Sequence, residues 1–266
     1  MRSAATVPAM ERFDAEGFSI AYDDLGEGDP IILLHGFAAD RITNWKATGW
    51  YRTLREAGFR VIAPDARGHG RSDKPSEPED YAPEGIAGDV IRLMDHLEID
   101  RADLFGYSMG GRNAGWLLAH HGERFNSVVI GGTGINLLEL EDAEYWTSRG
   151  FKLTADNRKT ESLAIPAMVP LYEKMTKIGG RPGALSACLL GSFSGLRESA
   201  FEGVETPALV IAGARDTVAG SPLPLAEVIP GGKAVVVPGK SHLSCVTDAF
   251  FRGAVLGFLG CRWQRE

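Results

Sequence analysis

Ser108 lies at the centre of the segment GYSMG, residues 106–110, which fits the pattern G-x-S-x-G. The segment follows a mainly apolar run and opens a helical pattern over residues 109–121, so a turn from strand to helix is predicted here. Gly106 and Gly110 lack Cβ atoms where strand and helix must approach closely, and the strained turn projects the serine hydroxyl clear of the sheet. This setting is typical of a nucleophilic serine. The alternative is an idle serine in a glycine-rich turn.

Two further residues have the types and the positions that would activate this serine. A serine hydroxyl is a weak nucleophile at neutral pH, so it needs a neighbouring base and a third group that orients the base. Asp216 follows the apolar run 208–212, and His242 follows the apolar run 234–237. The order serine, acid, histidine is the one expected with a nucleophile in such a turn. Ser108, Asp216 and His242 are therefore predicted to form a catalytic triad, in preference to a turn or capping aspartate and a surface histidine.

Backbone N–H groups are predicted to stabilise the negative charge that forms on oxygen when an ester carbonyl is attacked. One donor is the amide of Met109, which begins a helix whose dipole favours an anion. The other is the amide of Phe37, presented by a turn that His35 and Gly36 shape. Loss of one such donor typically costs about 2.7–4 kcal/mol of transition-state stabilisation, so backbone geometry should matter more here than side chains.

The other histidines are predicted to be structural. His96 falls in the helical stretch 83–97, and His120 and His121 close the helix that follows the serine, where they can interact with its negative end. His69 belongs to a glycine-rich loop and is likewise left out of the predicted catalytic set.

The elements that must position these residues alternate along the chain as short apolar runs and longer helical patterns. Runs that are apolar throughout are typical of parallel strands covered by helices on both faces, so the sequence predicts an α/β fold with a mostly parallel central sheet flanked by helices. The segment LGEGD at 25–29, followed by Pro30, predicts a hairpin turn between the first two strands. The predicted strands are residues 18–22, 31–34, 60–63, 102–107, 127–131, 208–212 and 234–237.

The alternation of apolar runs and helical patterns stops between about residues 135 and 205, where prolines and glycines interrupt helix-compatible stretches. Roughly seventy residues are too many for a bare loop, so residues 135–205 are predicted to form a small helical cap, with 1–134 and 206–266 as the core domain. A surface excursion without a role is the alternative. Trp45 and Trp50 could line the pocket, belong to the core or lie on the surface. Packing is preferred over pocket lining for most apolar cap residues, which are Leu137, Leu138, Leu140, Tyr145, Trp146, Phe151, Ile165, Met168, Val169 and Leu171.

Composition excludes several classes of function. The 266 residues include 35 acidic and 28 basic side chains, a net charge of −7 without a dense basic cluster, so no nucleic-acid binding is expected. No apolar run approaches the roughly 20 residues that span a bilayer, and the first ten residues lack the apolar core of a secretory signal, so no membrane association is expected. Cys188, Cys245 and Cys261 lack C-x-x-C spacing, which favours a reducing, cytoplasmic location. The oligomeric state stays open.

The chain resembles the α/β-hydrolase superfamily over nearly its whole length outside the insertion. The resemblance rests on His35-Gly36-Phe37, the nucleophile elbow at 106–111, Asp216, His242 and the segment DARGHGRS at 65–72. The last of these is similar to the hallmark of the capped branch, which includes esterases, carbon-carbon hydrolases, cofactor-free haloperoxidases, epoxide hydrolases and dehalogenases. In that branch it is mainly a structural loop, so the resemblance implies no catalytic role for Asp65, Arg67 or His69.

Departures from particular subfamilies narrow the implied chemistry. Epoxide hydrolases and haloalkane dehalogenases carry an aspartate at the elbow, where this chain has Ser108. Hydrolases of ring-cleavage products usually resemble S-G-P-G after the His-Gly pair and carry Trp after the catalytic histidine, whereas here residues 38–40 are Ala-Ala-Asp and Leu243 follows His242. The resemblance thus implies hydrolysis of a carboxylic ester, with a lactone or thioester as alternatives and a short-chain ester as the default.

The implied enzyme takes a small molecule and water as substrates, passes through an acyl-enzyme on Ser108, and needs neither a metal nor an organic cofactor. The sequence also lacks Cys/His or carboxylate clusters with ligand spacing. A cofactor-free perhydrolase or haloperoxidase, or a carbon-carbon hydrolase, would use the same triad. A non-catalytic small-molecule receptor on the same fold is the alternative from a different class.

Overall fold

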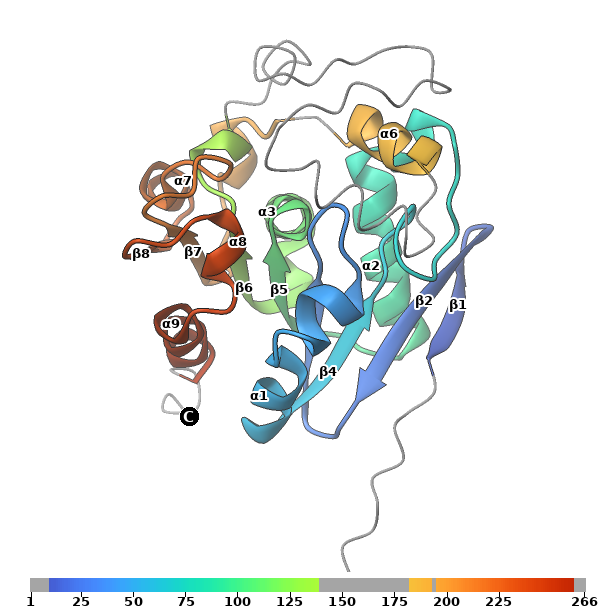
Figure 1. Cartoon of the computed structure of the whole chain (residues 1–266), viewed down its shortest axis with the longest axis horizontal. Coiled ribbons are helices and arrows are strands. Elements are labelled where there is room, and N and C mark those ends of the chain that lie inside the picture. The colour runs from blue at the N-terminus through green and yellow to red at the C-terminus, as the bar shows by residue number, and fades with distance from the viewer. Residues whose placement is uncertain (1–9, 139–181, 193–194, 261–266) are drawn as a thin grey trace, which may run out of the picture.

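An eight-stranded sheet forms the centre of the computed structural model, which describes residues 10–138, 182–192 and 195–260. The strand order is β1-β2-β4-β3-β5-β6-β7-β8, so β1 and β8 lie at opposite edges of the sheet (Figure 1). The two pairs that involve β2 are antiparallel and all other neighbouring pairs are parallel, which confirms the predicted α/β fold. The strands are β1 (Glu11–Ala15), β2 (Phe18–Leu25), β3 (Asp29–Leu34), β4 (Phe59–Pro64), β5 (Ala102–Tyr107), β6 (Phe125–Gly131), β7 (Ala208–Gly213) and β8 (Lys233–Val237).

The edge strand β1 is absent from the predicted set. Its sequence ERFDA has three charged residues and alternates between exposed and buried positions. An edge strand with one wet face carries no continuous apolar run, so its pattern is weaker than that of the covered strands. The other seven strands coincide with the predicted runs to within three residues at either end.

The hairpin predicted at residues 25–29 is wrong. β2 and β3 run in opposite directions but are not neighbours, because β4 lies between them. The hairpin joins β1 to β2 instead, through Glu16 and Gly17, which both have positive φ. The physical reason is the position of β3 inside the sheet. Residues 31–34 are buried, and both edges of β3 pair with parallel strands, β4 on one side and β5 on the other. The antiparallel β2 therefore pairs with the other edge of β4.

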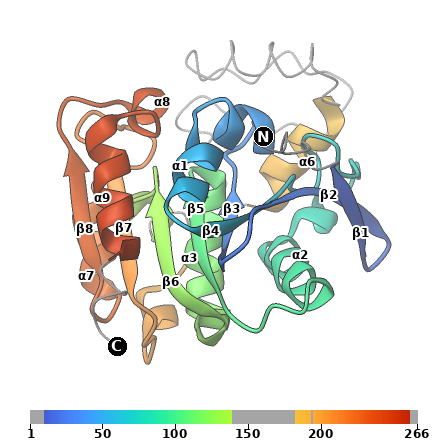
Figure 2. The same cartoon turned by 90° about the horizontal axis from the view of Figure 1, so that it is seen from below.

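Helices cover both faces of the sheet (Figure 2), and those that share its buried clusters are α1 (Trp50–Glu56), α2 (Pro83–His96), α3 (Met109–His121), α7 (Pro222–Val228) and α9 (Ala249–Gly260). α2, α3 and α7 share one buried apolar cluster, whereas α1 and α9 share a second. In β3, Ile32 and Leu34 belong to the first cluster, and Ile31 and Leu33 belong to the second. Successive side chains of a strand point to opposite faces, so the two clusters lie on opposite sides of the sheet.

Trp45 and Trp50 belong to the core, so the alternative that they line a pocket is wrong. Both side chains are fully buried, and the Trp50 indole N–H donates to the carbonyl of Val246 at 2.9 Å. The Trp45 ring packs against Phe105 of β5, with 4.7 Å between ring centroids. These aromatic side chains fill the space between α1, α9 and the sheet.

Only the two ends of the predicted cap fall among the described residues. At its start, Leu137 is buried in the core and Leu138 packs against it, as preferred for the apolar cap residues. At its end, helix α6 (Pro182–Gly191) packs against the short helix η2 (Pro78–Tyr81). The remaining cap residues named above, from Leu140 to Leu171, lie outside the described residues, so the division into core and cap stays a prediction.

No helix in the part of the chain that the structure describes is both long and apolar enough to cross a bilayer.

Candidate active site

Ser108 occupies a strained turn between β5 and α3. Its backbone has φ 57° and ψ −116°, which residues with a side chain rarely adopt. The flanking glycines make this turn feasible. A Cβ on Gly106 would lie 1.9 Å from the carbonyl oxygen of Gly110, and a Cβ on Gly110 would lie 1.9 Å from the carbonyl oxygen of Leu34. The structure thus has the close strand-helix approach that the G-x-S-x-G pattern predicts.

The carboxyl ends of the parallel strands bring Ser108, Asp216 and His242 together. Ser108 Oγ lies 2.8 Å from His242 Nε2, and His242 Nδ1 lies 2.8 Å from Asp216 Oδ2. Asp216 follows β7 and is buried, and its Oδ1 also accepts the backbone N–H groups of Val218 at 3.1 Å and Ala219 at 2.9 Å. A carboxylate can only accept, so Nδ1 carries the ring proton and Nε2 is free to accept the proton of the serine. This arrangement can carry out nucleophilic catalysis with a histidine base.

The peptide between Gly36 and Phe37 is held on its carbonyl side. The carbonyl oxygen of Gly36 accepts the Nδ1–H of His35 at 2.8 Å and the N–H of Ala39 at 3.2 Å. His35 Nε2 accepts the N–H of Ala66 at 3.0 Å, which fixes this tautomer. In a trans peptide the C=O and the following N–H point in opposite directions, so these contacts also fix the direction of the Phe37 N–H. His35 therefore contacts both this turn and the loop after β4.

Asn44 holds the same turn from its other side and was not predicted from the sequence. Its Oδ1 accepts the N–H of Gly36 at 2.9 Å. A Cβ on Gly36 would lie 3.3 Å from Ser108 Cβ, so the turn abuts the serine. Met109 begins α3 beside the same serine. The assignment of the Phe37 and Met109 amides as oxyanion donors stays a prediction, and nothing in the local sequence around Asn44 indicates that its side chain reaches back to residue 36.

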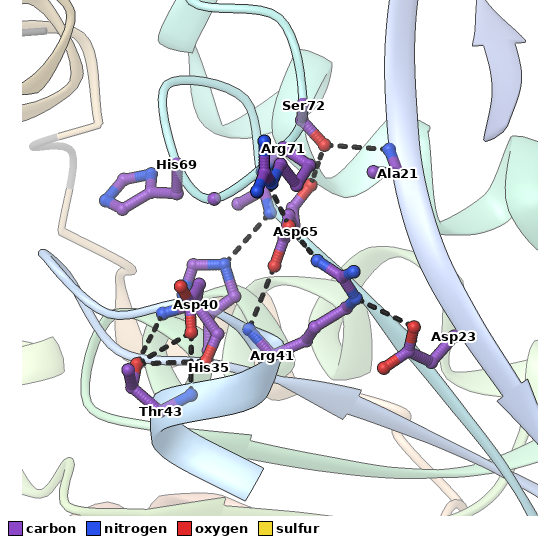
Figure 3. A network of polar contacts seen from close by, with 12 residues as sticks. Ala21, Asp23, His35, Asp40, Arg41, Thr43, Asp65, His69, Arg71 and Ser72 are labelled. Atoms are coloured by element: carbon purple, nitrogen blue, oxygen red, sulfur yellow. Dashed lines mark hydrogen bonds and ion pairs between the residues drawn. The ribbon is translucent and has the colours of Figure 1, made fainter. Parts of the chain in front are cut away.

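Asp65 fastens the loop after β4 to the segment that follows this turn (Figure 3). Its carboxylate accepts the backbone N–H of Arg41 at 2.9 Å and that of Arg71 at 2.7 Å, and it forms an ion pair with the Arg41 guanidinium. Arg41 also pairs with Asp23 of β2 at 2.9 Å. The Asp65 carbonyl accepts the Ser72 hydroxyl at 2.6 Å. These contacts form a structural network, and a structural role is also what the family resemblance implies for the loop at residues 65–72.

Arg67 and the histidines outside the triad have structural partners. The Arg67 guanidinium forms a bidentate pair with Asp89 of α2, with both N···O distances at 2.6 Å. His120 Nδ1 lies 2.9 Å from the carbonyl of Trp116, one turn earlier in α3. His96 stacks on Phe13, with 5.5 Å between ring centroids.

His69 is a fully buried histidine beside the site, in T-shaped ring contact with Phe37. Its Nδ1–H donates to the carbonyl of Arg67 at 2.9 Å, and its Nε2 has no partner among the described residues. Burial, and secondarily the nearby His35, lower the pKa of His69 to about 3.

This lowered pKa predicts a pH dependence of stability. The folded chain keeps His69 neutral, whereas the unfolded chain protonates it below its ordinary pKa of 6.5. The His69 contribution to stability is thus present above pH 6.5 and is lost as the pH falls toward 3, at up to about 1.4 kcal/mol per pH unit. Urea unfolding of wild type and His69→Phe between pH 7.5 and 4 is expected to show a steeper acid loss in the wild type. Parallel curves for the two proteins would contradict the assignment.

Helix α6 of the predicted cap contacts the elbow through the sulfur atoms of one cysteine and one methionine. Cys188 Sγ lies 3.9 Å from Met109 Sδ, and burial raises the pKa of the Cys188 thiol to about 12. Cys245, the other cysteine in the described part of the chain, is also buried and free. Cys261 lies outside the described residues. Within residues 10–138, 182–192 and 195–260, no group of three His, Cys, Asp or Glu side chains could hold a metal ion.

Comparison with known proteins identifies the family. A family model described as alpha/beta hydrolase fold matches residues 29–157. The chain is 30% identical over 218 residues to 3-oxoadipate enol-lactonase 2 of Acinetobacter baylyi, covering 77% of this chain and 78% of the relative. The chain therefore belongs to the α/β-hydrolase family. The resemblance inferred from the elbow, the His35-Gly36 turn and the loop at 65–72 is thus confirmed, and the chain is a hydrolase whose family acts on small molecules with water.

Solved structures of similar α/β-hydrolases cover almost the whole chain. The enol-lactonase from Burkholderia xenovorans LB400 superposes with a TM-score of 0.72 and 26% identity, over 94% of this hydrolase and 100% of that chain. A bromoperoxidase from Bacillus anthracis superposes with a TM-score of 0.70 and 25% identity, over 95% of this hydrolase and 99% of that chain.

Proposed function

We propose that the protein is a serine hydrolase that cleaves a carboxylic ester of a small molecule, with a lactone as the first substrate class to test, through an acyl-enzyme on Ser108. The observation that carries this proposal is the unbroken chain of contacts from Ser108 Oγ to His242 Nε2 and from His242 Nδ1 to Asp216, each 2.8 Å long. A thioester is the alternative acyl substrate. The similarity to two enol-lactonases supports the lactone class.

The first half-reaction forms the acyl-enzyme. His242 Nε2 accepts the proton of Ser108 as Oγ attacks the acyl carbon, and Asp216 holds the imidazole in the required tautomer and stabilises its charged form. The amides of Phe37 and Met109 bind the oxyanion of the tetrahedral intermediate. Protonated His242 then gives its proton to the departing alkoxide oxygen, and the alcohol leaves.

The second half-reaction releases the acid. His242 Nε2 accepts a proton from water, whose oxygen attacks the acyl carbon, and the Ser108 oxygen leaves and regains its proton from the imidazole. With a lactone substrate, the alcohol of the first step stays attached to the acyl group, so the product is a single hydroxy acid. This chemistry invokes no metal or organic cofactor.

A fluorophosphonate probe tests the proposed nucleophile. The wild type is expected to take up one probe per chain on the tryptic peptide that contains Ser108, because the probe phosphonylates a serine, with loss of fluoride, only when a base activates it. Ser108→Ala is the matched control and should remain unlabelled. A parallel screen of p-nitrophenyl esters from acetate to octanoate, with γ- and δ-lactones followed by acid release, identifies the substrate class. Equal labelling of the two proteins would remove Ser108 from its role.

A second candidate function is perhydrolysis, in which hydrogen peroxide replaces water and the acyl-enzyme yields a peracid. The similarity to a bromoperoxidase favours testing it. The triad serves either acceptor, so the two activities are compared in one experiment that measures ester hydrolysis and acetate-dependent bromination by the same preparation. A carbon-carbon hydrolase is disfavoured because this chain has Leu243 where such enzymes usually carry Trp after the catalytic histidine. The family membership favours an enzyme over a non-catalytic receptor.

A further inference from the structure

Tyr107, the residue directly before the serine, fits into a slot that glycines create. Its ring lies beside the end of β6, where a Cβ on Gly131 would lie 3.0 Å from the ring atom Cδ2 and a Cβ on Gly132 would lie 2.8 Å from Cζ. The side chain is buried, and it meets Phe251 of α9 edge to face with 5.9 Å between centroids. Bulkier residues at positions 131 and 132, where β6 ends, would push this ring out of place.

The Tyr107 hydroxyl reaches the backbone of His242. It donates to the His242 carbonyl oxygen at 2.5 Å, across 135 positions of sequence. The tyrosine ring also lies beside the imidazole, with 5.6 Å between centroids and 35° between planes. His242 opens α8 (His242–Cys245), a helix of four residues that begins with a capping box between Ser241 and Ser244. So short a helix has few further hydrogen bonds of its own to hold its backbone.

We propose that Tyr107 is a positioning residue that ties the backbone of His242 to the elbow and thereby keeps Nε2 within hydrogen-bond distance of Ser108. The inference rests on the proposed function, because it assigns Tyr107 a role only if His242 is the base. Ser108 and Tyr107 are adjacent in the chain, so one rigid turn carries the nucleophile and also holds its base. A misplacement of about 1 Å between reacting groups can lower a rate by about 10²-fold, so a single tether of this kind is expected to matter.

The Tyr107 hydroxyl can donate this hydrogen bond at every pH at which the enzyme would be assayed. Burial raises the pKa of Tyr107 well above its ordinary value of 10, so the group stays protonated throughout the pH range of an enzyme assay. A carbonyl oxygen can only accept, so the phenol must be the donor. Tyr107→Phe removes this donor and keeps the ring in its slot.

The test compares Tyr107→Phe with a matched control. Tyr81→Phe also removes a buried phenol that donates to a backbone carbonyl, and its acceptor is Pro75 at 2.8 Å rather than a residue of the triad. Tyr107→Phe is expected to lower kcat, and the rate of fluorophosphonate labelling, by roughly 10- to 100-fold with KM within about twofold of wild type. Tyr81→Phe should keep kcat within about twofold, while the two variants lose comparable amounts of thermal stability.

A spectroscopic readout separates positioning from general stability. The ¹H NMR signal of His242 Nδ1–H in its hydrogen bond to Asp216 is expected to broaden or shift in Tyr107→Phe and to stay unchanged in Tyr81→Phe. A Tyr107→Phe enzyme that keeps kcat, labelling rate and this signal would overturn the inference and leave the proposed function intact. Absence of labelling in the wild type would instead remove the proposed function itself.

Discussion

Replacing His242 by alanine is expected to lower kcat for ester or lactone hydrolysis on the order of 10⁵-fold, with a small change in KM. The imidazole is the sole base within hydrogen-bond distance of Ser108 Oγ among the described contacts, and it acts in both half-reactions. A serine hydroxyl at neutral pH cannot attack an ester effectively without it. The residual rate should come from oxyanion stabilisation and substrate binding alone. Steady-state kinetics on the best ester or lactone substrate provides the measurement.

His120→Ala is the matched control for this prediction. His120 is an exposed histidine at the end of α3, whose imidazole contacts the carbonyl of Trp116 rather than the triad. Its removal should leave kcat within about twofold. A His242→Ala enzyme that retains more than a hundredth of the wild-type kcat would mean that another group removes the proton from Ser108.

Local sequence patterns predicted the covered strands well because their burial on both faces is recorded in continuous apolar runs. The edge strand β1 was missed because its charged, alternating sequence contains no apolar run, whereas the neighbours of β3 were predicted wrongly because they depend on how the strands are ordered in space. A turn sequence such as LGEGD reports that the chain reverses, but it does not report whether a later strand will insert between the two arms. The insertion of β4 depends on the pairing needs of β3, which are set by the whole sheet.

In the candidate site, too, some features follow from local sequence patterns and others depend on the arrangement of the chain in space. The convergence of the serine, the acid and the histidine was predictable because each has a distinctive residue type after a strand, and such ends converge at one edge of a parallel sheet. The supporting contacts of Asn44 and Tyr107 were not predictable. Asparagine and tyrosine serve many roles, and the distance of 135 positions between Tyr107 and its acceptor leaves no local pattern to read. The turn at His35 was predictable only in part, since its partner Ala66 comes from another loop.

The supporting contacts have a common geometry. Two loops beside Ser108 are held through their backbone atoms. The side chain of His35 binds the carbonyl of Gly36, that of Asn44 binds the N–H of Gly36, and that of Tyr107 binds the carbonyl of His242. Backbone atoms are fixed by the fold, so contacts of this kind transmit the rigidity of the sheet to the loops. Preorganised donors gain their catalytic value from such rigidity, because they do not have to reorganise when charge develops.

Asp216→Asn is expected to lower kcat on the order of 10⁴-fold, and the structure gives the reason atom by atom. Asp216 Oδ1 accepts two backbone N–H groups, from Val218 and Ala219, so the amide oxygen of the asparagine must take this position. Its NH₂ group then occupies the place of Oδ2 and donates to His242 Nδ1. The ring proton is thereby forced onto Nε2, which can no longer accept the proton of the serine.

Asp248→Asn is the matched control, because its Oδ1 also accepts two backbone N–H groups, from Phe250 at 2.8 Å and Phe251 at 3.3 Å, while its other oxygen pairs with Lys240 rather than with the triad. This variant should keep kcat within a few-fold of wild type. ¹⁵N NMR of labelled histidine should find the His242 proton on Nδ1 in wild type and Asp248→Asn, and on Nε2 in Asp216→Asn. A proton that stays on Nδ1 in Asp216→Asn would contradict the argument even if the rate fell, because the loss would then arise from charge rather than from the tautomer.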